Sequence, residues 1–355
     1  MKAHGGDIYS PYQIEAGRSL LDLSANINPL GMPPRAKEAI VAHIGDYEAY
    51  PDTEQRSLRA AIGRWEGVAP EHICCGSGAA DLIFRLAWAL RPKRALVAAP
   101  TFSEYAAAMK TVGCAVAEHP LRRERGFDLG ADFVEAVTPG TELVFVCNPN
   151  NPTGRLVERG TLLALARRCR ELGALLVVDE CFLDFVPAAA DYTMKPYLKE
   201  YDNLLILRAF TKLFAMAGLR LGYLLSAGPA LEAVRACGQP WCVSTVAAVC
   251  GEAALAEPGW REKSAAFVAA ERERLLRGLR ELGLEVVEGA VNYLLFRSRD
   301  TALYERLLPY GILLRRCSNF TGLDEHWYRT AVRTREENER LLSALGEIKE
   351  RGAEL

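Results

Sequence analysis

Residues 204–223 read LLILRAFTKLFAMAGLRLGY, and this stretch decides the fold. An apolar run ends abruptly in polar residues, and a second cation, Arg220, follows Lys212 eight residues later. We interpret the run as a buried strand that brings Lys212 into a pocket, where burial and a nearby cation lower the pKa of its amine. Such an amine forms imines readily. The alternative, from these residues alone, is an ordinary exposed lysine after a strand.

The residues around Lys212 suit a phosphate-bearing partner. Thr211 offers a hydroxyl and Arg220 a planar guanidinium fork. Gly218 and Gly222 allow the backbone to turn close beside the ligand. We therefore interpret Lys212 as a candidate Schiff-base lysine for pyridoxal phosphate.

The composition predicts a cytoplasmic protein with a small-molecule partner. Half of the 355 residues are hydrophobic, so the chain can bury a large core and form two lobes. A formal charge of -2, with both signs interspersed, gives no field suited to nucleic acid. The ten cysteines show no CxxC and no zinc-type spacing, which is typical of reduced cytosolic thiols. Since no charged leader and no apolar run of about 18 residues is present, we expect no membrane partner.

From residue 72 onward, short apolar runs alternate with amphipathic helical patterns. This alternation is typical of an α/β protein with parallel strands covered on both faces. Ligands of such sheets bind at the carboxyl ends of the strands. We expect an N-terminal arm and part of the small domain in residues 1–45, a large cofactor-binding domain in 46–235, and a small C-terminal domain in 236–355.

Two motifs near the first predicted strands suit an anionic, planar ligand. Residues 76–80, GSGAA, lie between a strand and a helix, where free amide groups and the helix N-terminus can bind an anion. A plain tight turn explains those residues equally well in isolation. Phe102 follows the next strand and can stack on a planar ring, although core packing is the commoner role of a single phenylalanine.

Polar side chains also follow two later strands. Asn151 lies in the loop NPNNPTG at 148–154, whose two prolines fix its conformation. A cis peptide bond before Pro152 is compatible with this loop. Asn151 can then donate a hydrogen bond to a phenolate-like oxygen. Asp179 ends an apolar strand, and a charged aspartate there requires a cation or strong donors. A protonated pyridine nitrogen meets that need, and a helix cap is the alternative.

Cations late in the chain predict a substrate with two anionic groups. Arg315, Arg316 and Arg333 lie at or near the ends of short strand patterns, and arginine forms fork-like contacts with carboxylate and phosphate. Solvated surface arginines are the alternative, which is strongest for Arg316. His4 is the one histidine in a glycine-rich stretch with no core to join.

Six motifs occur in the order found in fold-type I enzymes that depend on pyridoxal phosphate: GSGAADLI, PTF, NPNNPTG, VVDE, the lysine of RAFTK, and GLRLGY. The chain resembles that superfamily over nearly its full length, which implies a mainly parallel large domain and a smaller α/β domain. Within it, the chain resembles the threonine-phosphate decarboxylases and the related histidinol-phosphate aminotransferases. Four segments resemble the decarboxylases: HGG at 4–6, LSANINPLGMP at 23–33, ILLRRCSNFTGLD at 312–324 and YRTAVR at 328–333.

The resemblance implies roles around the cofactor ring. Lys212 forms the Schiff base, Asp179 pairs with the pyridine nitrogen, and Asn151 bonds the ring hydroxyl oxygen. Phe102 stacks on the ring. Many aminotransferases have a tyrosine where this chain has Phe182, so one hydrogen bond to the ring oxygen is absent.

The resemblance also implies which residues bind the cofactor phosphate. They are Gly78, Ala79, Thr211 and Arg220, with Tyr50 from a neighbouring subunit. The last contact implies a homodimer. Ala209 replaces a serine or threonine that is frequent in relatives, so we expect somewhat weaker cofactor retention.

For the substrate, the resemblance places Arg333 at the carboxylate, with Arg315 and His4 near the phosphate. Asn28, in the LSANINPLGMP segment, is counted with them as a substrate-binding residue.

The implied reaction is decarboxylation of O-phospho-L-threonine to (R)-1-aminopropan-2-yl phosphate in cobalamin biosynthesis. One alternative is a histidinol-phosphate-type aminotransferase. Another is a phosphoserine decarboxylase, whose substrate lacks one methyl group worth about 1–3 kcal/mol of discrimination. A non-catalytic regulator that binds the cofactor is an alternative of a different class. Two observations argue against it: the sequence shows no DNA-binding module, and both Lys212 and Asp179 are present.

Overall fold

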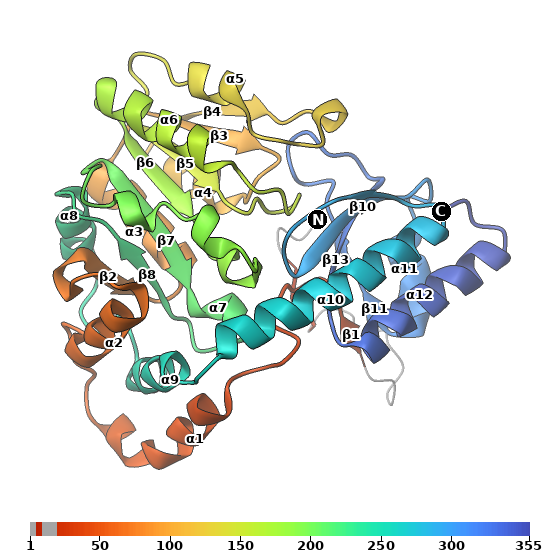
Figure 1. The fold of residues 1–355 in the computed structure, drawn as a ribbon, viewed down its shortest axis with the longest axis horizontal. Coiled ribbons are helices and arrows are strands. Elements are labelled where there is room, and N and C mark those ends of the chain that lie inside the picture. Colours follow the sequence, from red (N-terminus) through yellow and green to blue (C-terminus); the bar gives the residue numbers. More distant parts are fainter. Residues whose placement is uncertain (1–4, 9–19) are drawn as a thin grey trace.

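The computed structural model describes residues 5–8 and 20–355 and contains two main sheets (Figure 1). The larger has seven strands in the order β2-β8-β7-β6-β5-β3-β4. Their bounds are β2 Ile73–Gly76, β3 Arg94–Ala99, β4 Ala115–Pro120, β5 Leu143–Cys147, β6 Leu175–Asp179, β7 Leu204–Ala209 and β8 Gly222–Leu225. The strands from β3 to β7 pair in parallel, while β8 is antiparallel to both β7 and β2. The prediction of a mainly parallel sheet is therefore confirmed.

The apolar runs of this sheet supply two hydrophobic cores, because side chains alternate between the faces of a strand. In β5, Val144 and Val146 belong to one core, whereas Leu143 and Phe145 belong to the other. Helices α2 Arg56–Glu66, α5 Ala131–Glu135 and α6 Arg159–Glu171 contribute to the first core. Helices α3 Ala79–Leu90, α4 Glu104–Lys110 and α8 Ala230–Ala236 contribute to the second.

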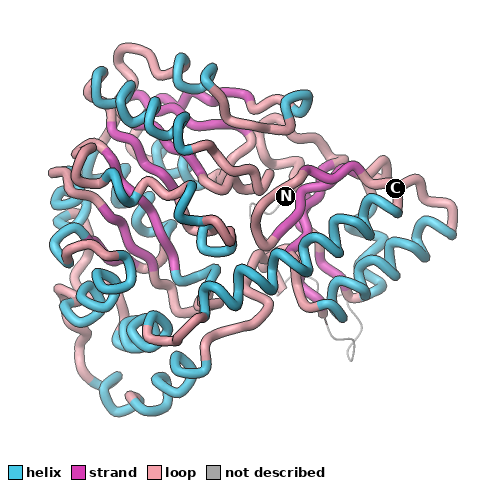
Figure 2. Tube along the Cα trace, viewed as in Figure 1, coloured by secondary structure: helices cyan, strands magenta, loops and turns pink. Residues whose placement is uncertain are grey.

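The smaller sheet is antiparallel, in the order β12-β13-β10-β9. Its strands are β9 Glu285–Val287, β10 Tyr293–Arg297, β12 Arg315–Arg316 and β13 Trp327–Ala331. Beside it, β1 Leu21–Asp22 pairs in parallel with β11 Ile312–Leu313. A third core lies under helices α10 Trp260–Glu281, α11 Leu303–Leu307 and α12 Arg335–Glu350. Figure 2 shows α10 running from below the large sheet to the small domain, so it links the two.

Two helices pack differently from the predicted domain division. Helix α1, Pro34–Ala42, lies within 1–45, and α9, Thr245–Leu255, lies within 236–355, yet they pack against each other and α9 packs on α2. Both contribute to the first core of the large sheet. A side chain at Gly251 of α9 would meet Leu221 at 2.6 Å, so the small residue permits this close approach. Both helices therefore pack on the large sheet, and the division into domains stays a prediction.

Arg208, the first cation of the stretch 204–223, is buried on β7 and paired with acidic groups. Its guanidinium lies 2.7 Å from Glu180 and 3.1 Å from Asp184. Asp184 also pairs at 2.9 Å with Arg261, near the start of α10. A buried charge requires such partners, and these pairs connect the central strands to the linking helix.

No helix within residues 5–8 and 20–355 is long and apolar enough to cross a bilayer. The same residues contain no cluster of three or more His, Cys, Asp or Glu side chains that could hold a metal ion.

Candidate active site

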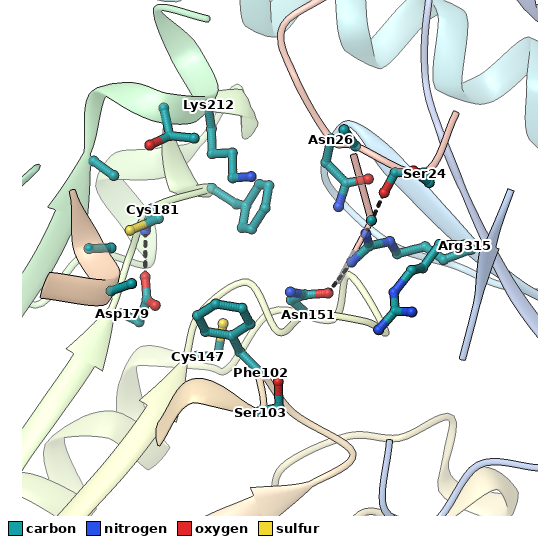
Figure 3. Close-up of a pocket in the computed structure, with 18 of the residues that line it drawn as sticks. Ser24, Asn26, Phe102, Ser103, Cys147, Asn151, Asp179, Cys181, Lys212 and Arg315 are labelled. Atoms are coloured by element: carbon teal, nitrogen blue, oxygen red, sulfur yellow. Dashed lines mark hydrogen bonds between the residues drawn. The ribbon is translucent and has the colours of Figure 1, made fainter. Parts of the chain in front are cut away.

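A cavity of about 250 Å³ lies where the carboxyl ends of the central strands face the small domain (Figure 3). Its lining comes from the large sheet, from the segment 24–26, and from the small-domain strands β12 and β13. Many of the residues predicted from the sequence line this one cavity: Ala79, Phe102, Asn151, Asp179, Thr211, Lys212, Arg220 and Arg315. This placement agrees with the expectation that the ligand site lies at the carboxyl ends of the strands.

Lys212 lies on α7, Phe210–Leu213, a short helix that begins directly after β7. Its amine points into the cavity and lies 5.2 Å from the centre of the Phe182 ring (Figure 3). Burial, followed by the nearby charge of Arg329, lowers the pKa of Lys212 from 10.5 to about 8. A substantial fraction of this amine is therefore neutral near physiological pH, as imine formation requires.

Asp179 is the last residue of β6 and is 5% exposed. The Tyr105 hydroxyl donates to its Oδ2 at 2.7 Å. The Cys181 backbone N–H donates to its Oδ1 at 3.0 Å (Figure 3). Tyr105 is itself held by a stacked contact with Phe145, with ring centroids 4.9 Å apart. Two donors therefore hold the carboxylate in place.

Asn151 lies in a loop with cis bonds before Pro149 and Pro152, so the predicted cis bond is confirmed. An Arg329 N–H donates to Asn151 Oδ1 (Figure 3). Because a guanidinium only donates, it fixes the amide oxygen on its own side. The amide nitrogen of Asn151 is then available to donate within the cavity.

The start of α3 and the Arg220 guanidinium form an anion-binding corner. Gly78 precedes α3 with φ 86° and no side-chain cap, so the first amide groups of the helix keep their capacity to donate. A Cβ at Gly78 would lie 2.6 Å from Arg220 Nη2, which shows how closely the guanidinium packs on this turn. Ala79 and Thr211 line the cavity beside it. Together they supply the donors that a phosphate prefers.

Two arginines face the cavity from the small domain. Arg315 on β12 pairs directly with Arg329 on β13, so the two side chains share one face of the sheet. They are 6% and 5% exposed, and burial lowers the pKa of both guanidinium groups. Arg329 also donates to the Ser24 carbonyl at 3.0 Å, and Arg315 to Asn319 Oδ1 at 2.9 Å.

The structure corrects the placement of Arg333. Strand β13 ends at Ala331, and Arg333 follows it at the turn into α12, outside the cavity lining. Its guanidinium lies 3.1 Å from Glu337 on the first turn of that helix. Arg329, four residues earlier, occupies the cavity instead. Side chains alternate along β13, and Tyr328 belongs to the small-domain core. Arg329, the next residue, therefore points the other way, toward the cavity.

Asn28 is a second correction. Its side-chain amide is buried and donates to the Leu213 carbonyl and to Ser264, so it does not line the cavity. Asn26 lines it, and Asn26 Oδ1 is buried with no hydrogen-bond partner among the described residues. Ser24 is a further lining residue that the sequence interpretation missed. The turn-rich segment signalled a ligand nearby but not which side chains would face it.

Two other predicted residues lie outside this cavity. His4 falls outside the described residues, although its neighbour Gly5 lines the cavity. Tyr50 is 82% exposed and its ring packs against Trp241 with centroids 4.8 Å apart. Its predicted contact is with another subunit, so it stays a prediction.

Two cysteine thiols, of Cys147 and Cys181, also line the cavity. Burial, followed by the nearby charge of Asp179, raises the pKa of both. Phe182 and Ala209, the two departures from the sequence pattern, lie in the same lining. The cavity wall therefore carries no side-chain hydroxyl group at either position.

A family model described as aminotransferase class I and II matches residues 18–345. The chain belongs to this family. Among its members, the threonine-phosphate decarboxylase of Salmonella typhimurium is 40% identical over 352 residues, which are 98% of this chain and 96% of the relative. The predicted resemblance is thereby confirmed.

Solved structures of the aminotransferase class I and II type confirm the predicted fold-type I architecture. The histidinol-phosphate aminotransferase from Clostridium acetobutylicum has a TM-score of 0.88 at 29% identity, covering 94% of this chain and 100% of that one. The L-threonine-O-3-phosphate decarboxylase from Porphyromonas gingivalis has a TM-score of 0.83 at 25% identity, covering 92% and 99%.

The side chains that this family member places around the cavity fit pyridoxal phosphate. The amine of Lys212 suits the aldehyde, and the Asp179 carboxylate suits the ring nitrogen. The Asn151 amide can bond the ring hydroxyl, and Phe102 lines the cavity where a ring can stack. The corner at Gly78 suits the phosphate, because Arg220 packs closely on the turn and the first amide groups of α3 have no side-chain cap.

Proposed function

We propose that this chain is a carboxy-lyase that uses pyridoxal phosphate to decarboxylate O-phospho-L-threonine, giving (R)-1-aminopropan-2-yl phosphate for cobalamin biosynthesis. The name of the Salmonella relative, which matches almost the whole chain, supports the choice of reaction. The fit of the cavity residues supports the choice of cofactor.

The pairing of Arg315 with Arg329 carries the proposal. Like charges directly opposite each other in a sheet repel, so a ligand with two neighbouring anionic groups stabilises this pair. O-phospho-L-threonine carries its carboxylate and its phosphate on adjacent carbons. Histidinol phosphate has a phosphate and no carboxylate, so it matches one of the two guanidinium groups, whereas 2-oxoglutarate, the other substrate of that aminotransferase, can match both; the Salmonella relative therefore decides between the two reactions.

Each cavity residue then has a chemical task. When bound, pyridoxal phosphate supplies the electron sink for the pair released as the bond from Cα to the carboxylate breaks. Arg315 and Arg329 hold the two anionic groups and thereby orient the substrate, which decides the bond that breaks. Asp179 keeps the proton on the ring nitrogen. Lys212, with a pKa of about 8 before it reacts, returns a proton to Cα as a general acid.

The test is to measure gas release from O-phospho-L-threonine and O-phospho-L-serine side by side with the purified protein and pyridoxal phosphate. We expect carbon dioxide release, with the threonine derivative preferred. Transfer of an amino group from histidinol phosphate to 2-oxoglutarate, with no carbon dioxide from either phosphoamino acid, would refute the proposal. A Lys212→Ala variant is the control, because it loses the amine and should show neither the imine absorbance nor turnover.

The enzyme is proposed to act as a homodimer in which Tyr50 reaches the cofactor phosphate of the other subunit. Tyr50 and the Trp241 ring that it contacts are 82% and 48% exposed, and Val41 and Ile44, earlier in the chain, are 72% and 69% exposed. Exposed apolar groups of this size favour an interface. Sedimentation should give a dimer, and Tyr50→Phe should retain the dimer while weakening cofactor retention; a monomeric holoenzyme would contradict this.

A cytoplasmic location is part of the proposal. All ten cysteines are free thiols in the structure, and most are buried. A reducing compartment maintains cysteines in this state. Cell fractionation tests the location directly, and recovery of the native protein outside the cytoplasmic fraction would contradict it.

A further inference from the structure

Helix α7 carries Lys212 and has only four residues, Phe210–Leu213. The last carbonyl groups of a helix have no partners within it. In a helix this short, the groups that bond those carbonyls decide where its side chains point. The partners of the Lys212 and Leu213 carbonyls therefore bear on the position of the amine.

Asn28 supplies two of those partners. Its backbone N–H donates to the Lys212 carbonyl at 3.2 Å. Its side-chain Nδ2 donates to the Leu213 carbonyl at 2.7 Å. Leu213 also accepts from Trp260 Nε1 at 3.1 Å, at the start of α10. The Ala215 N–H also donates to the Lys212 carbonyl at 3.3 Å, whereas the Leu213 carbonyl accepts from side chains of two distant segments of the chain.

The Asn28 side chain is held in this orientation on every side. It is 1% exposed, and its Nδ2 also donates to Ser264 on α10 at 2.9 Å. Its Oδ1 accepts from the Leu30 N–H at 3.0 Å. Because both Nδ2 and Oδ1 are engaged, the amide cannot turn away from Leu213 without losing hydrogen bonds in a buried place.

The same segment reaches the substrate side of the cavity. Ser24, four residues before Asn28, accepts from Arg329 through its carbonyl, and Asn26 lines the cavity between them. Residues 24–28 therefore join the guanidinium that holds an anionic group of the substrate to the helix that holds the amine.

We propose that Asn28 is a positioning residue for Lys212, which sets the place of the amine relative to the substrate Cα. The proposal rests on the proposed function, in which Lys212 returns the proton to Cα. A misplacement of a reacting group by about 1 Å can lower the rate of a reaction about 100-fold. We therefore expect the loss of the Nδ2 hydrogen bond to reduce kcat by about tenfold to 100-fold. The substrate anions bind elsewhere, so KM should stay within about twofold of the wild-type value.

The experiment uses the holoenzyme and the variants Asn28→Ala, Asn28→Asp and Ser264→Ala. Asn28→Asp keeps the size of the side chain and the oxygen that accepts from the Leu30 N–H. Its side chain has no N–H to donate to the Leu213 carbonyl. Ser264→Ala removes the other acceptor of the same amide and leaves both hydrogen bonds to α7 intact. Melting temperatures identify any variant that fails to fold. If one of the two Asn28 variants fails to fold, the other one is compared with the wild type.

The decisive readout is the stereochemistry of the proton delivered to Cα during turnover in D₂O. We expect one configuration of deuterated product from the wild type and from Ser264→Ala, and a mixture with a reduced kcat from both Asn28 variants. One configuration and an unchanged kcat in a folded Asn28 variant would overturn the proposal.

Failure of the proposed function is recognised separately. If the wild type releases no carbon dioxide from O-phospho-L-threonine, the pH titration of the lysine imine absorbance replaces turnover as the readout. A shifted titration midpoint in the Asn28 variants, but not in Ser264→Ala, supports the positioning role. Identical midpoints in all proteins overturn it.

Discussion

Replacement of Arg329 by lysine tests the central correction that the structure makes. The change keeps the positive charge but replaces a planar fork with a single ammonium group. In the structure, the two terminal nitrogens of Arg329 bond Asn151 and the Ser24 carbonyl. A lysine cannot keep both contacts and also hold an anionic group of the substrate.

The expected loss follows from the hydrogen bonds given up. A hydrogen bond to a charged group contributes about 1.5–3 kcal/mol. At about 1.4 kcal/mol per tenfold change, the loss of one such bond to the substrate lowers kcat/KM by about tenfold to 160-fold. Arg333→Lys is the matched control. Arg333 pairs with Glu337 outside the cavity, and partly exposed pairs contribute only about 0–1 kcal/mol to stability, so we expect activity within about twofold of the wild type.

The assay is carbon dioxide release from O-phospho-L-threonine at a saturating concentration of pyridoxal phosphate, measured over a range of substrate concentrations. The cofactor absorbance of each variant shows that the site is filled. A large loss in Arg333→Lys together with near wild-type activity in Arg329→Lys would refute the reasoning, because the position expected from the sequence would then be the correct one.

Three further changes probe the cofactor site and the sheet beneath it. Because the pKa of Lys212 is lowered to about 8, its neutral fraction is about one half at pH 8 and levels off above about pH 9, and the rate at which the apoprotein captures pyridoxal phosphate should follow it; a rate that still climbs steeply to pH 10 would contradict this. Gly78→Ala places a Cβ 2.6 Å from Arg220 Nη2 and should weaken cofactor binding about tenfold to 160-fold by equilibrium titration, while Gly113→Ala, at a similar φ of 73° but with open space around it, should leave binding unchanged. Arg208→Met leaves the buried Glu180 carboxylate without its cation, while Asp184 keeps Arg261, and should lower the free energy of unfolding by about 3–5 kcal/mol in urea, with Arg208→Lys recovering part of it; equal stability of Arg208→Met and wild type would show that the buried pairs contribute nothing.

The large sheet and the residues at its strand ends could be predicted from the sequence. Strands buried on both faces are continuous apolar runs, and a polar residue at the end of such a run stands out. Asp179 and Lys212 were both found in this way, and the structure places both in one cavity. Asn151 and Arg220 lie in loops where apolar periodicity gives no information, and the prolines and glycines around them indicated them instead.

The small-domain side of the site was harder to predict because its strands are short. Strand β12 has two residues and β13 has five, so alternation has little length in which to show which side chain faces the cavity. Arg329 and Arg333 are four residues apart, and the sequence does not show that the strand ends between them. Only the pairing of β12 with β13 placed Arg329 opposite Arg315.

The segment 24–28 illustrates a different limit. Its density of turn formers indicated a ligand nearby, and Asn26 does line the cavity. Asn28 turns instead toward Leu213 and Ser264, which lie 185 and 236 residues further along the chain. Contacts at such separations depend on the tertiary packing of α10, and no local pattern reports them.

The two thiols in the cavity wall have a consequence for the fidelity of cofactor loading. A thiolate adds to aldehydes, so an ionised cysteine here would compete with the lysine and could trap the vitamin as an unproductive thiohemiacetal. The raised pKa of Cys147 and Cys181 keeps both sulfur atoms protonated at neutral pH, whereas the lowered pKa of Lys212 frees its nitrogen. The opposite shifts make the amine the preferred nucleophile toward an incoming aldehyde, although three nucleophilic side chains border the same space.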